Sequence, residues 1–282
     1  MLDKFEKSIW KTKFSVQSFG VNFEVESDDA AQNEKIKSFL PINCDLRASE
    51  ETSRADFVLS FNFHSKSLAR GFYRNDELIM PFESDVPSRL EDVLKTKILF
   101  SIAEHATAFT FLHAGAVALD DRAVLCIGQS RSGKTTLVAD FVRAGALYYT
   151  DDCAIVDQNG NLQVFPKPLA IRDSIGTQRE HSIESLGGRA GESPLPVAML
   201  LFVEYNADAI GWKPQRLTVG NCVLKLMQNI YYSQTVRKNP KVIISNLERL
   251  ASSSVAFEGK RGDTQKVIDF TSKFLVSYKT LK

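Results

Sequence analysis

The sequence lacks the features that mark several large classes of protein. Only four of its 282 residues are cysteines, at positions 44, 126, 153 and 222, and none forms a Cys-x-x-Cys pair. This spacing gives no support for a zinc site or a thioredoxin-type redox centre. Buried free thiols are the expectation for Cys126 and Cys153, which lie in apolar runs. No stretch reaches the ~18 uncharged apolar residues of a membrane span, so no membrane partner is expected.

An excess of charge of one sign is also missing. The chain has 35 Lys+Arg against 34 Asp+Glu, a net charge of +1, and a pI near 7.6. We therefore expect no broad basic surface and no nucleic-acid partner. The first residues alternate charged and aromatic side chains without the apolar run of a secretory signal, so a cytoplasmic protein is expected. With 44% hydrophobic and 24% charged residues, the composition is that of an ordinary globular protein.

The hydrophobic patterns predict an α/β protein with two domains. Apolar and polar residues alternate as in strands over 14–27, 55–65 and 69–82, and helical spacing covers 30–40. The polar stretch between Pro81 and Pro87 is the predicted boundary. It separates a smaller N-terminal α/β domain, residues 1–87, from a second domain, residues 88–282, in which strands and helices also alternate.

In the second domain, a hairpin is predicted over 111–128 with its turn at Asp120-Asp121. The strand 122–127, a helix over 134–144 and a strand over 146–150 then form a β–α–β crossover. Such a crossover makes the two strands parallel and brings their carboxyl ends to one edge of the sheet. Ligands of open α/β sheets bind at that edge.

One segment, the phosphate loop, matches the pattern G-x-x-x-x-G-K-[ST] at every fixed position: Gly128-Gln129-Ser130-Arg131-Ser132-Gly133-Lys134-Thr135. The two glycines let backbone N–H groups point at phosphate oxygens, and the following helix adds its positive dipole end. Lys134 is expected to reach the β- and γ-phosphates, and Thr135 to offer its hydroxyl to Mg²⁺. The loop and the next residue, Thr136, are thus the predicted nucleotide site. The motif alone leaves ATP and GTP both open.

Two adjacent carboxylates, Asp151 and Asp152, follow the strand 146–150 at the same edge. They could hold Mg²⁺ or accept a proton from an attacking hydroxyl, although a polar turn is the alternative explanation. Pairing across the hairpin turn sets His113 opposite Ile127 or Gly128, beside the phosphate loop. There it could hold an aspartate or contact a phosphate.

Three further charged residues are weaker candidates. Arg172 could neutralise phosphate charge, as phosphoryl transfer requires. Arg131 in the loop and Glu204 after a buried strand over 197–205 could also serve the site, or could be ordinary surface charges. The sequence has no LSGGQ-like signature, no NKxD motif and no helicase-type basic and aromatic channel, so these classes of nucleotide-binding protein find no support.

The run from Leu112 to Asp157 resembles the catalytic core of HPr serine kinase/phosphorylase. It is still more similar to the HPr-kinase-related proteins of peptide-modification gene clusters, including kinases that phosphorylate lasso-peptide precursors. The shared elements are a histidine in the first hairpin strand, the phosphate loop, a helix that ends in glycine, and a paired aspartate. Eighteen residues separate Lys134 from Asp152, as in that family. The resemblance weakens over 164–205 and further outside it.

The resemblance implies an HPr-kinase-like core with ATP and Mg²⁺ as cofactors. On this basis Lys134 binds phosphates, Thr135 binds the metal, and Asp152 is the general base. His113 matches the active-site histidine of the family, and Asp151 its neighbouring acid.

One position departs from the family pattern. The family's L-E-I-R-G segment, whose Glu binds Mg²⁺, is Leu169-Ala170-Ile171-Arg172-Asp173 here. Either Asp151, Asp152 or Glu204 completes the metal shell, or the nucleotide holds most of the metal.

The expected activity is transfer of the γ-phosphoryl group of ATP to a serine hydroxyl of a peptide or small protein, such as a lasso-type precursor. The N-terminal domain is expected to help hold this substrate. A small-molecule hydroxyl kinase and a non-catalytic nucleotide-binding module are the alternatives. The Asp pair favours an enzyme, because a binding module needs no base. The sequence leaves open whether the chain forms a homo-oligomer.

Overall fold

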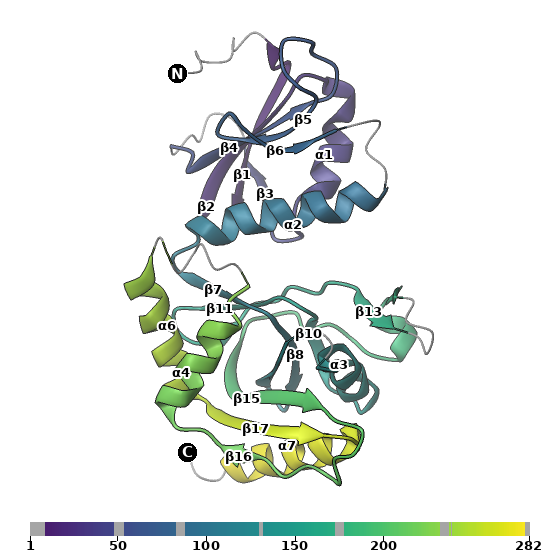
Figure 1. Cartoon of the computed structure of the whole chain (residues 1–282), viewed down its shortest axis with the longest axis vertical. Coiled ribbons are helices and arrows are strands. Elements are labelled where there is room, and N and C mark those ends of the chain that lie inside the picture. The colour runs from purple at the N-terminus through teal and green to yellow at the C-terminus, as the bar shows by residue number, and fades with distance from the viewer. Residues whose placement is uncertain are drawn as a thin grey trace. The chain divides into compact units, whose positions relative to one another are not determined.

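The computed structural model describes residues 9–47, 54–82, 88–129, 132–172, 178–231, 237 and 239–279. Contacts between Cα atoms divide the chain into two compact units, Met1–Ala106 and Thr107–Lys282 (Figure 1). Each unit combines a sheet with helices, so the protein has the α/β fold that the sequence predicts. No helix among the described residues is both long enough and apolar enough to cross a membrane.

The first unit contains a mixed sheet with the strand order β3-β1-β2-β4-β5-β6. Its elements are β1 (Thr12–Ser18), β2 (Val21–Ser27), η2 (Ala30–Gln32), α1 (Asn33–Phe39), β3 (Asp45–Arg47), β4 (Phe57–Asn62), β5 (Gly71–Arg74), β6 (Glu77–Pro81) and α2 (Ser88–His105). The strand-like stretches 14–27 and 69–82 each form a hairpin, β1–β2 around Gly20 and β5–β6 around Asn75-Asp76. Buried aromatic residues, among them Phe23, Phe57 and Phe61, form its core.

The boundary between the units differs from the predicted one. The sequence places it before Ser88, whereas the contacts place it after Ala106, because α2 packs on the first sheet. The Glu104 carboxylate of α2 pairs with the Arg74 guanidinium of β5 at 2.5 Å. At the end of α2 the His105 ring lies 5.0 Å from that of Phe57. A polar stretch in the sequence therefore precedes a helix of the first unit rather than the second unit.

The second unit is built on a larger sheet with the strand order β10-β8-β9-β15-β12-β11-β7, to which β17 is added beside β15 and β16 beside β17. Its elements are β7 (Phe109–Leu112), β8 (Ala114–Leu119), β9 (Arg122–Ile127), α3 (Lys134–Arg143), β10 (Leu147–Thr150), β11 (Ala154–Asp157), β12 (Asn161–Leu162), β13 (Leu169–Arg172), β14 (Gln178–His181), η3 (Glu184–Leu186), β15 (Leu195–Tyr205), β16 (Gln215–Arg216), α4 (Val219–Gln228), α6 (Pro240–Ser253), β17 (Val255–Arg261) and α7 (Thr264–Lys279). The long strand β15 is parallel to both β9 and β17.

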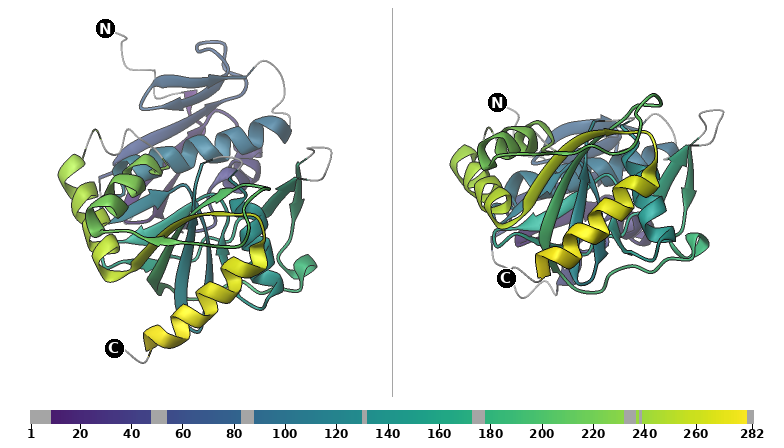
Figure 2. Two further views of the ribbon diagram at one scale, coloured as in Figure 1. Left: turned by 60° about the horizontal axis from the view of Figure 1, so that its bottom comes forward. Right: turned by 90° about the horizontal axis from the view of Figure 1, so that it is seen from below.

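Helices cover both faces of this sheet (Figure 2). Alternate residues of a strand point to opposite faces, so Val124 and Cys126 of β9 pack with α3 and α7, whereas Leu125 and Ile127 pack with α4 and α6. The apolar runs of β9 and β15 are continuous rather than alternating because each strand is buried on both faces.

The predicted crossover is confirmed with one strand inserted. The strand β8 lies between β9 and β10 and is antiparallel to both. Therefore β9 and β10 point the same way, and their carboxyl ends share one edge of the sheet. The phosphate loop leaves β9 at that edge, Asp151 follows β10, and His113 precedes β8. The apolar run predicted as one strand over 111–119 divides at His113 into β7 and β8, which pair with different partners.

Candidate active site around the phosphate loop

The phosphate loop connects the buried strand β9 to the first turn of α3. Ser132 N–H donates to the Gln129 carbonyl at 3.1 Å, which closes a turn within the loop. Tyr205 N–H, at the end of β15, donates to the Ser132 carbonyl, also at 3.1 Å. The neighbouring parallel strand thus fixes the position of the loop. Ser130 and Arg131, two predicted nucleotide-binding residues, lie outside the described residues.

Two glycines of the loop are required by its geometry. Gly133 has φ = +81° and directly precedes α3, a conformation that side-chain-bearing residues rarely adopt. A Cβ atom on Gly128 would lie 2.5 Å from the Ser132 Oγ and 2.6 Å from the Val203 carbonyl oxygen. The spacing of the two glycines therefore reflects a left-handed turn at one end and a close backbone approach at the other.

The Lys134 side chain is 7% exposed and turns back over the loop. Its Nζ donates to the carbonyls of Gly128 at 2.7 Å and Gln129 at 3.0 Å, and it lies 3.1 Å from His113 Nε2. Burial lowers the pKa of Lys134, while the carboxylates of Asp152 and Asp151 raise it in part. The ammonium group is therefore held where the loop and the histidine meet.

His113 connects Lys134 to Asp152. Its Nδ1 lies 3.1 Å from Asp152 Oδ1, and its Nε2 faces the Lys134 ammonium. An ammonium group can only donate, so Nε2 accepts and Nδ1 carries the proton that is donated to Asp152. Burial lowers the pKa of His113, although Asp152 raises it in part. Both observations indicate a neutral imidazole.

Asp152 has an unusual backbone conformation, with φ = +73°. Left-handed φ values are uncommon for residues other than glycine and are frequent at functional sites. The turn directs the Asp152 carboxylate at His113 and leaves the side chain 48% exposed. A half-exposed carboxylate can receive a proton from a hydroxyl that approaches from solvent.

Asp151 points the other way and is only 4% exposed. Its Oδ2 accepts a hydrogen bond of 2.9 Å from the Thr135 hydroxyl, and its buried Oδ1 has no hydrogen-bond partner among the described residues. Burial raises the pKa of Asp151 to about 6, although the Thr135 hydrogen bond lowers it in part. A carboxylate paired with the loop hydroxyl, with one oxygen unpartnered, fits a Mg²⁺ ion shared with a nucleotide.

No group of three or more His, Cys, Asp or Glu side chains in the described part of the chain could hold a metal by itself. Mg²⁺ keeps several waters and is bound in proteins by one or two carboxylates plus phosphate oxygens. Thr135 and Asp151 are the residues that could hold it here. Thr136 lies exposed in the first turn of α3.

The structure describes the weaker candidates only in part. Ala170 lies in the β13–β14 hairpin opposite Glu180, and the side chain of Arg172 in the same hairpin lies outside the described part. Glu204 is exposed at the end of β15, where it pairs with Lys260 at 3.6 Å. It lines a cavity on the β17 side of the loop.

Arg261 is a residue that sequence reasoning missed. It ends β17, is 1% exposed, and donates from Nη2 to the Gly133 carbonyl at 2.6 Å. Its guanidinium carbon lies 5.7 Å from the Tyr205 ring, and within the described residues no carboxylate forms an ion pair with it. The apolar pattern of the sequence predicts a strand over 253–258, whereas β17 continues to Arg261 and so brings this residue to the active edge of the sheet.

The segment after α4 was also missed. The sequence predicts a helix over 219–233, but α4 ends at Gln228, because Ile230 pairs with Leu112 of β7 instead. The Asn229 carbonyl then accepts a hydrogen bond of 2.7 Å from His113 N–H. The Tyr231 ring lies 6.3 Å from the His113 ring, and burial raises the pKa of Tyr231 above its ordinary value. This segment therefore forms one wall around the histidine.

Comparisons with known proteins find a match among solved structures. No family model matches the chain, and no curated protein sequence matches it. Among solved structures, it is similar to the HPr(Ser) kinase/phosphatase from Coxiella burnetii, with 12% sequence identity and a TM-score of 0.36. The similarity covers 60% of this chain and 98% of that chain. The chemistry of the site is therefore argued from its own side chains.

Proposed function

We propose that this protein is an ATP- and Mg²⁺-dependent kinase that transfers the γ-phosphoryl group to a serine hydroxyl of a peptide or small protein. The observation that carries the proposal is a pair of contacts made by His113: its Nδ1 lies 3.1 Å from Asp152 Oδ1, and its Nε2 lies 3.1 Å from Lys134 Nζ. These contacts connect an exposed candidate base to the lysine of a phosphate loop. A module that only binds nucleotides has no need for this connection.

Each residue of the site has its own role in the proposed phosphoryl transfer. Loop amides and Lys134 bind and neutralise the phosphates, which is the main requirement of this reaction. Thr135 and Asp151 would hold Mg²⁺, which when bound would offset the negative charge of the phosphates. Asp152 accepts the proton of the acceptor hydroxyl as that oxygen attacks phosphorus. Neutral His113 donates to Asp152, which fixes the direction of the carboxylate.

The nature of the acceptor rests on the resemblance over residues 112–157, which favours ATP as donor and a peptide serine as acceptor. The exposed Asp152 carboxylate supports a large acceptor, because a hydroxyl on a polypeptide can reach it from solvent. The first unit is proposed to help hold that polypeptide.

The substitution Asp152→Asn tests the proposal. It keeps the size of the side chain but removes the basic oxygen, and general-base help is worth roughly 10²–10⁴-fold. We expect ATP affinity to be retained and single-turnover transfer to fall by at least about a hundredfold. Calorimetry with ATP and transfer from γ-labelled ATP to an array of serine-containing peptides measure the two effects separately.

Asp121→Asn is the matched control. Asp121 also has a positive φ, +57°, but lies in the β8–β9 turn at the opposite end of β9 from the loop. It should change neither quantity. Transfer at the wild-type rate by Asp152→Asn would show that Asp152 is not the base. Loss of ATP binding together with transfer would assign Asp152 to the metal or to the structure.

Lys134→Ala tests the nucleotide site itself. It removes the charge expected to span the β- and γ-phosphates, so both ATP binding and transfer should fall to background. Near-normal transfer by this variant would remove the phosphate loop from the proposal.

A further inference from the structure

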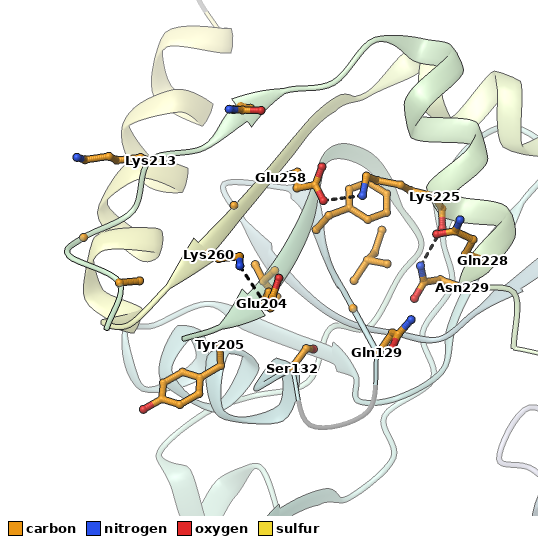
Figure 3. Close-up of a pocket in the computed structure, with 18 of the residues that line it drawn as sticks. Gln129, Ser132, Glu204, Tyr205, Lys213, Lys225, Gln228, Asn229, Glu258 and Lys260 are labelled. Atoms are coloured by element: carbon orange, nitrogen blue, oxygen red, sulfur yellow. Dashed lines mark hydrogen bonds and ion pairs between the residues drawn. The ribbon is translucent and has the colours of Figure 1, made fainter. Parts of the chain in front are cut away.

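A cavity of about 1030 Å³ borders the phosphate loop on the side of β15 and β17 (Figure 3). Gln129 and Ser132 of the loop form one end of it. The carboxyl ends of β15 and β17 form its floor, and α4 forms a wall. Its volume is close to the upper limit found for small-molecule sites, roughly 1,000 Å³.

The cavity and the chemical groups lie on opposite sides of β9. His113 and Asp152 come from β8 and β10, which follow β9 in one direction along the sheet, whereas β15 and β17 follow it in the other. None of Lys134, His113, Asp151 or Asp152 lines the cavity. A triphosphate whose terminal phosphate lies at Lys134 and Asp152 therefore has its other end free to run along the loop toward the cavity.

The lining combines an apolar floor with polar groups at its edges. Ile210, which is 90% exposed, and the nearly buried Phe202 supply apolar surface, and the amides of Gln129, Gln228 and Asn229 supply both donors and acceptors. A base has apolar faces and a polar edge, so this lining matches it.

Two carboxylates complete the lining. Glu258 pairs with Lys225 at 2.5 Å, and Glu204 pairs with Lys260 at 3.6 Å. Each carboxylate has further lone pairs that can accept hydrogen bonds from the hydroxyls of a ribose.

We propose that this cavity binds the nucleoside part of the nucleotide, an inference that rests on the proposed function. The γ-phosphate then lies at the His113 side of the loop, where the acceptor arrives, and the base lies at the α4 side. The acceptor enters from the half-exposed Asp152 and does not share the cavity.

The test compares ATP with inorganic tripolyphosphate, which has the phosphates but no nucleoside. The variant Gln228→Trp places a large ring in the cavity from an exposed position on α4. Calorimetry with Mg²⁺ should show at least about a tenfold loss of ATP affinity and less than about a twofold change for tripolyphosphate. Leu224→Trp is the matched control, since Leu224 is 61% exposed on the same helix and does not line the cavity.

Glu258→Gln gives a second, smaller perturbation that should not disturb folding. It removes a hydrogen-bond acceptor for the ribose and a negative charge near the phosphates, so the ratio of ATP affinity to tripolyphosphate affinity should fall. An unchanged ratio in both variants would overturn the inference.

Two other outcomes would also overturn it. Unchanged ATP affinity in Gln228→Trp with loss of peptide phosphorylation would make the cavity an acceptor site. Equal wild-type affinities for ATP and tripolyphosphate would mean that no nucleoside subsite exists. Failure of the proposed function would give a different result. Either ATP and tripolyphosphate would not bind to the wild-type protein, or Lys134→Ala would not weaken their binding.

Discussion

Asp151 and Arg261 are buried ionisable groups of opposite charge that flank the first turn of α3. The Asp151 carboxyl contacts the Thr135 hydroxyl, and the Arg261 guanidinium contacts the Gly133 carbonyl. Each has one buried polar atom without a hydrogen-bond partner in the part of the chain that the structure describes. Groups of this kind lower stability and are retained where they serve a site. Both can therefore be tested by separating stability from ligand binding.

Asp151→Asn should change the pH dependence of stability. Burial raises the pKa of Asp151 from 3.8 to about 6, so the native protein holds a proton that the unfolded chain releases. The stability that this provides is full below pH ~4 and is lost as the pH rises through ~6. The variant avoids this loss, so its gain in free energy of unfolding should grow over that window to about 2–3 kcal/mol.

Urea unfolding at pH 4 and pH 7.5 in the presence of a chelator measures this effect. A gain of equal size at both pH values would show that Asp151 does not ionise in the native protein over this range.

Arg261→Met should weaken phosphate binding more than it weakens the fold. It removes a buried positive charge beside the loop. Such a charge contributes on the order of 1–2 kcal/mol to the binding free energy of a polyanion. We expect about a tenfold loss of tripolyphosphate affinity, measured by calorimetry, while Arg261→Lys retains most of it. A large drop in melting temperature with unchanged affinity would make Arg261 a purely structural support for Gly133.

At the scale of elements, the site is the edge where β8, β9, β10, β15 and β17 meet α3. The loop is held by hydrogen bonds from the ends of two strands that are remote in sequence, Tyr205 of β15 and Arg261 of β17. The rigidity of the loop therefore depends on the order of the strands.

Gly128→Ala tests this dependence. Its Cβ would lie 2.6 Å from the backbone oxygen of Val203, so either the loop or β15 has to shift. We expect a loss of about 1–3 kcal/mol in the free energy of unfolding and at least about a tenfold loss in ATP affinity, from urea unfolding and calorimetry. Gly220→Ala is the control, because nothing lies within 4 Å of its added Cβ. Unchanged ATP affinity in Gly128→Ala would mean that the loop tolerates movement.

At the scale of the whole molecule, each unit has its own sheet and its own buried core. In the second unit both faces of the sheet are covered by helices of the same unit. The phosphate loop, the Asp pair, His113 and the cavity all lie within residues 107–282.

A fragment of residues 107–282 should therefore fold and bind ATP with an affinity within about twofold of the full chain. Phosphorylation of a peptide substrate should fall if the first unit holds that substrate, whereas ATP binding should not. Circular dichroism and calorimetry measure folding and binding. A folded fragment that does not bind ATP would show that the first unit contributes to the nucleotide site.

Local patterns in the sequence were sufficient to predict several features of this protein. The spacing of Gly128, Gly133 and Lys134 predicted the loop, because the backbone geometry of that turn requires residues without side chains at fixed positions. Pairing across the Asp120-Asp121 turn predicted that His113 lies opposite Ile127 or Gly128, and the observed pairing of Ala114 with Ile127 confirms that register. Each of these predictions depends on residues close together in the chain.

The tertiary structure decided what depends on distant pairing. The parallel alignment of β17 with β15 brings Arg261 to Gly133, 128 residues away, and no local pattern encodes which strand lies beside which. The end of α4 at Gln228 and the placement of α2 in the first unit have the same origin. For α4, contacts with a remote strand outweigh the helical periodicity of the sequence. For α2, contacts with the first sheet outweigh the polar stretch that precedes the helix. In both cases burial in a shared core contributes more free energy than local preference does.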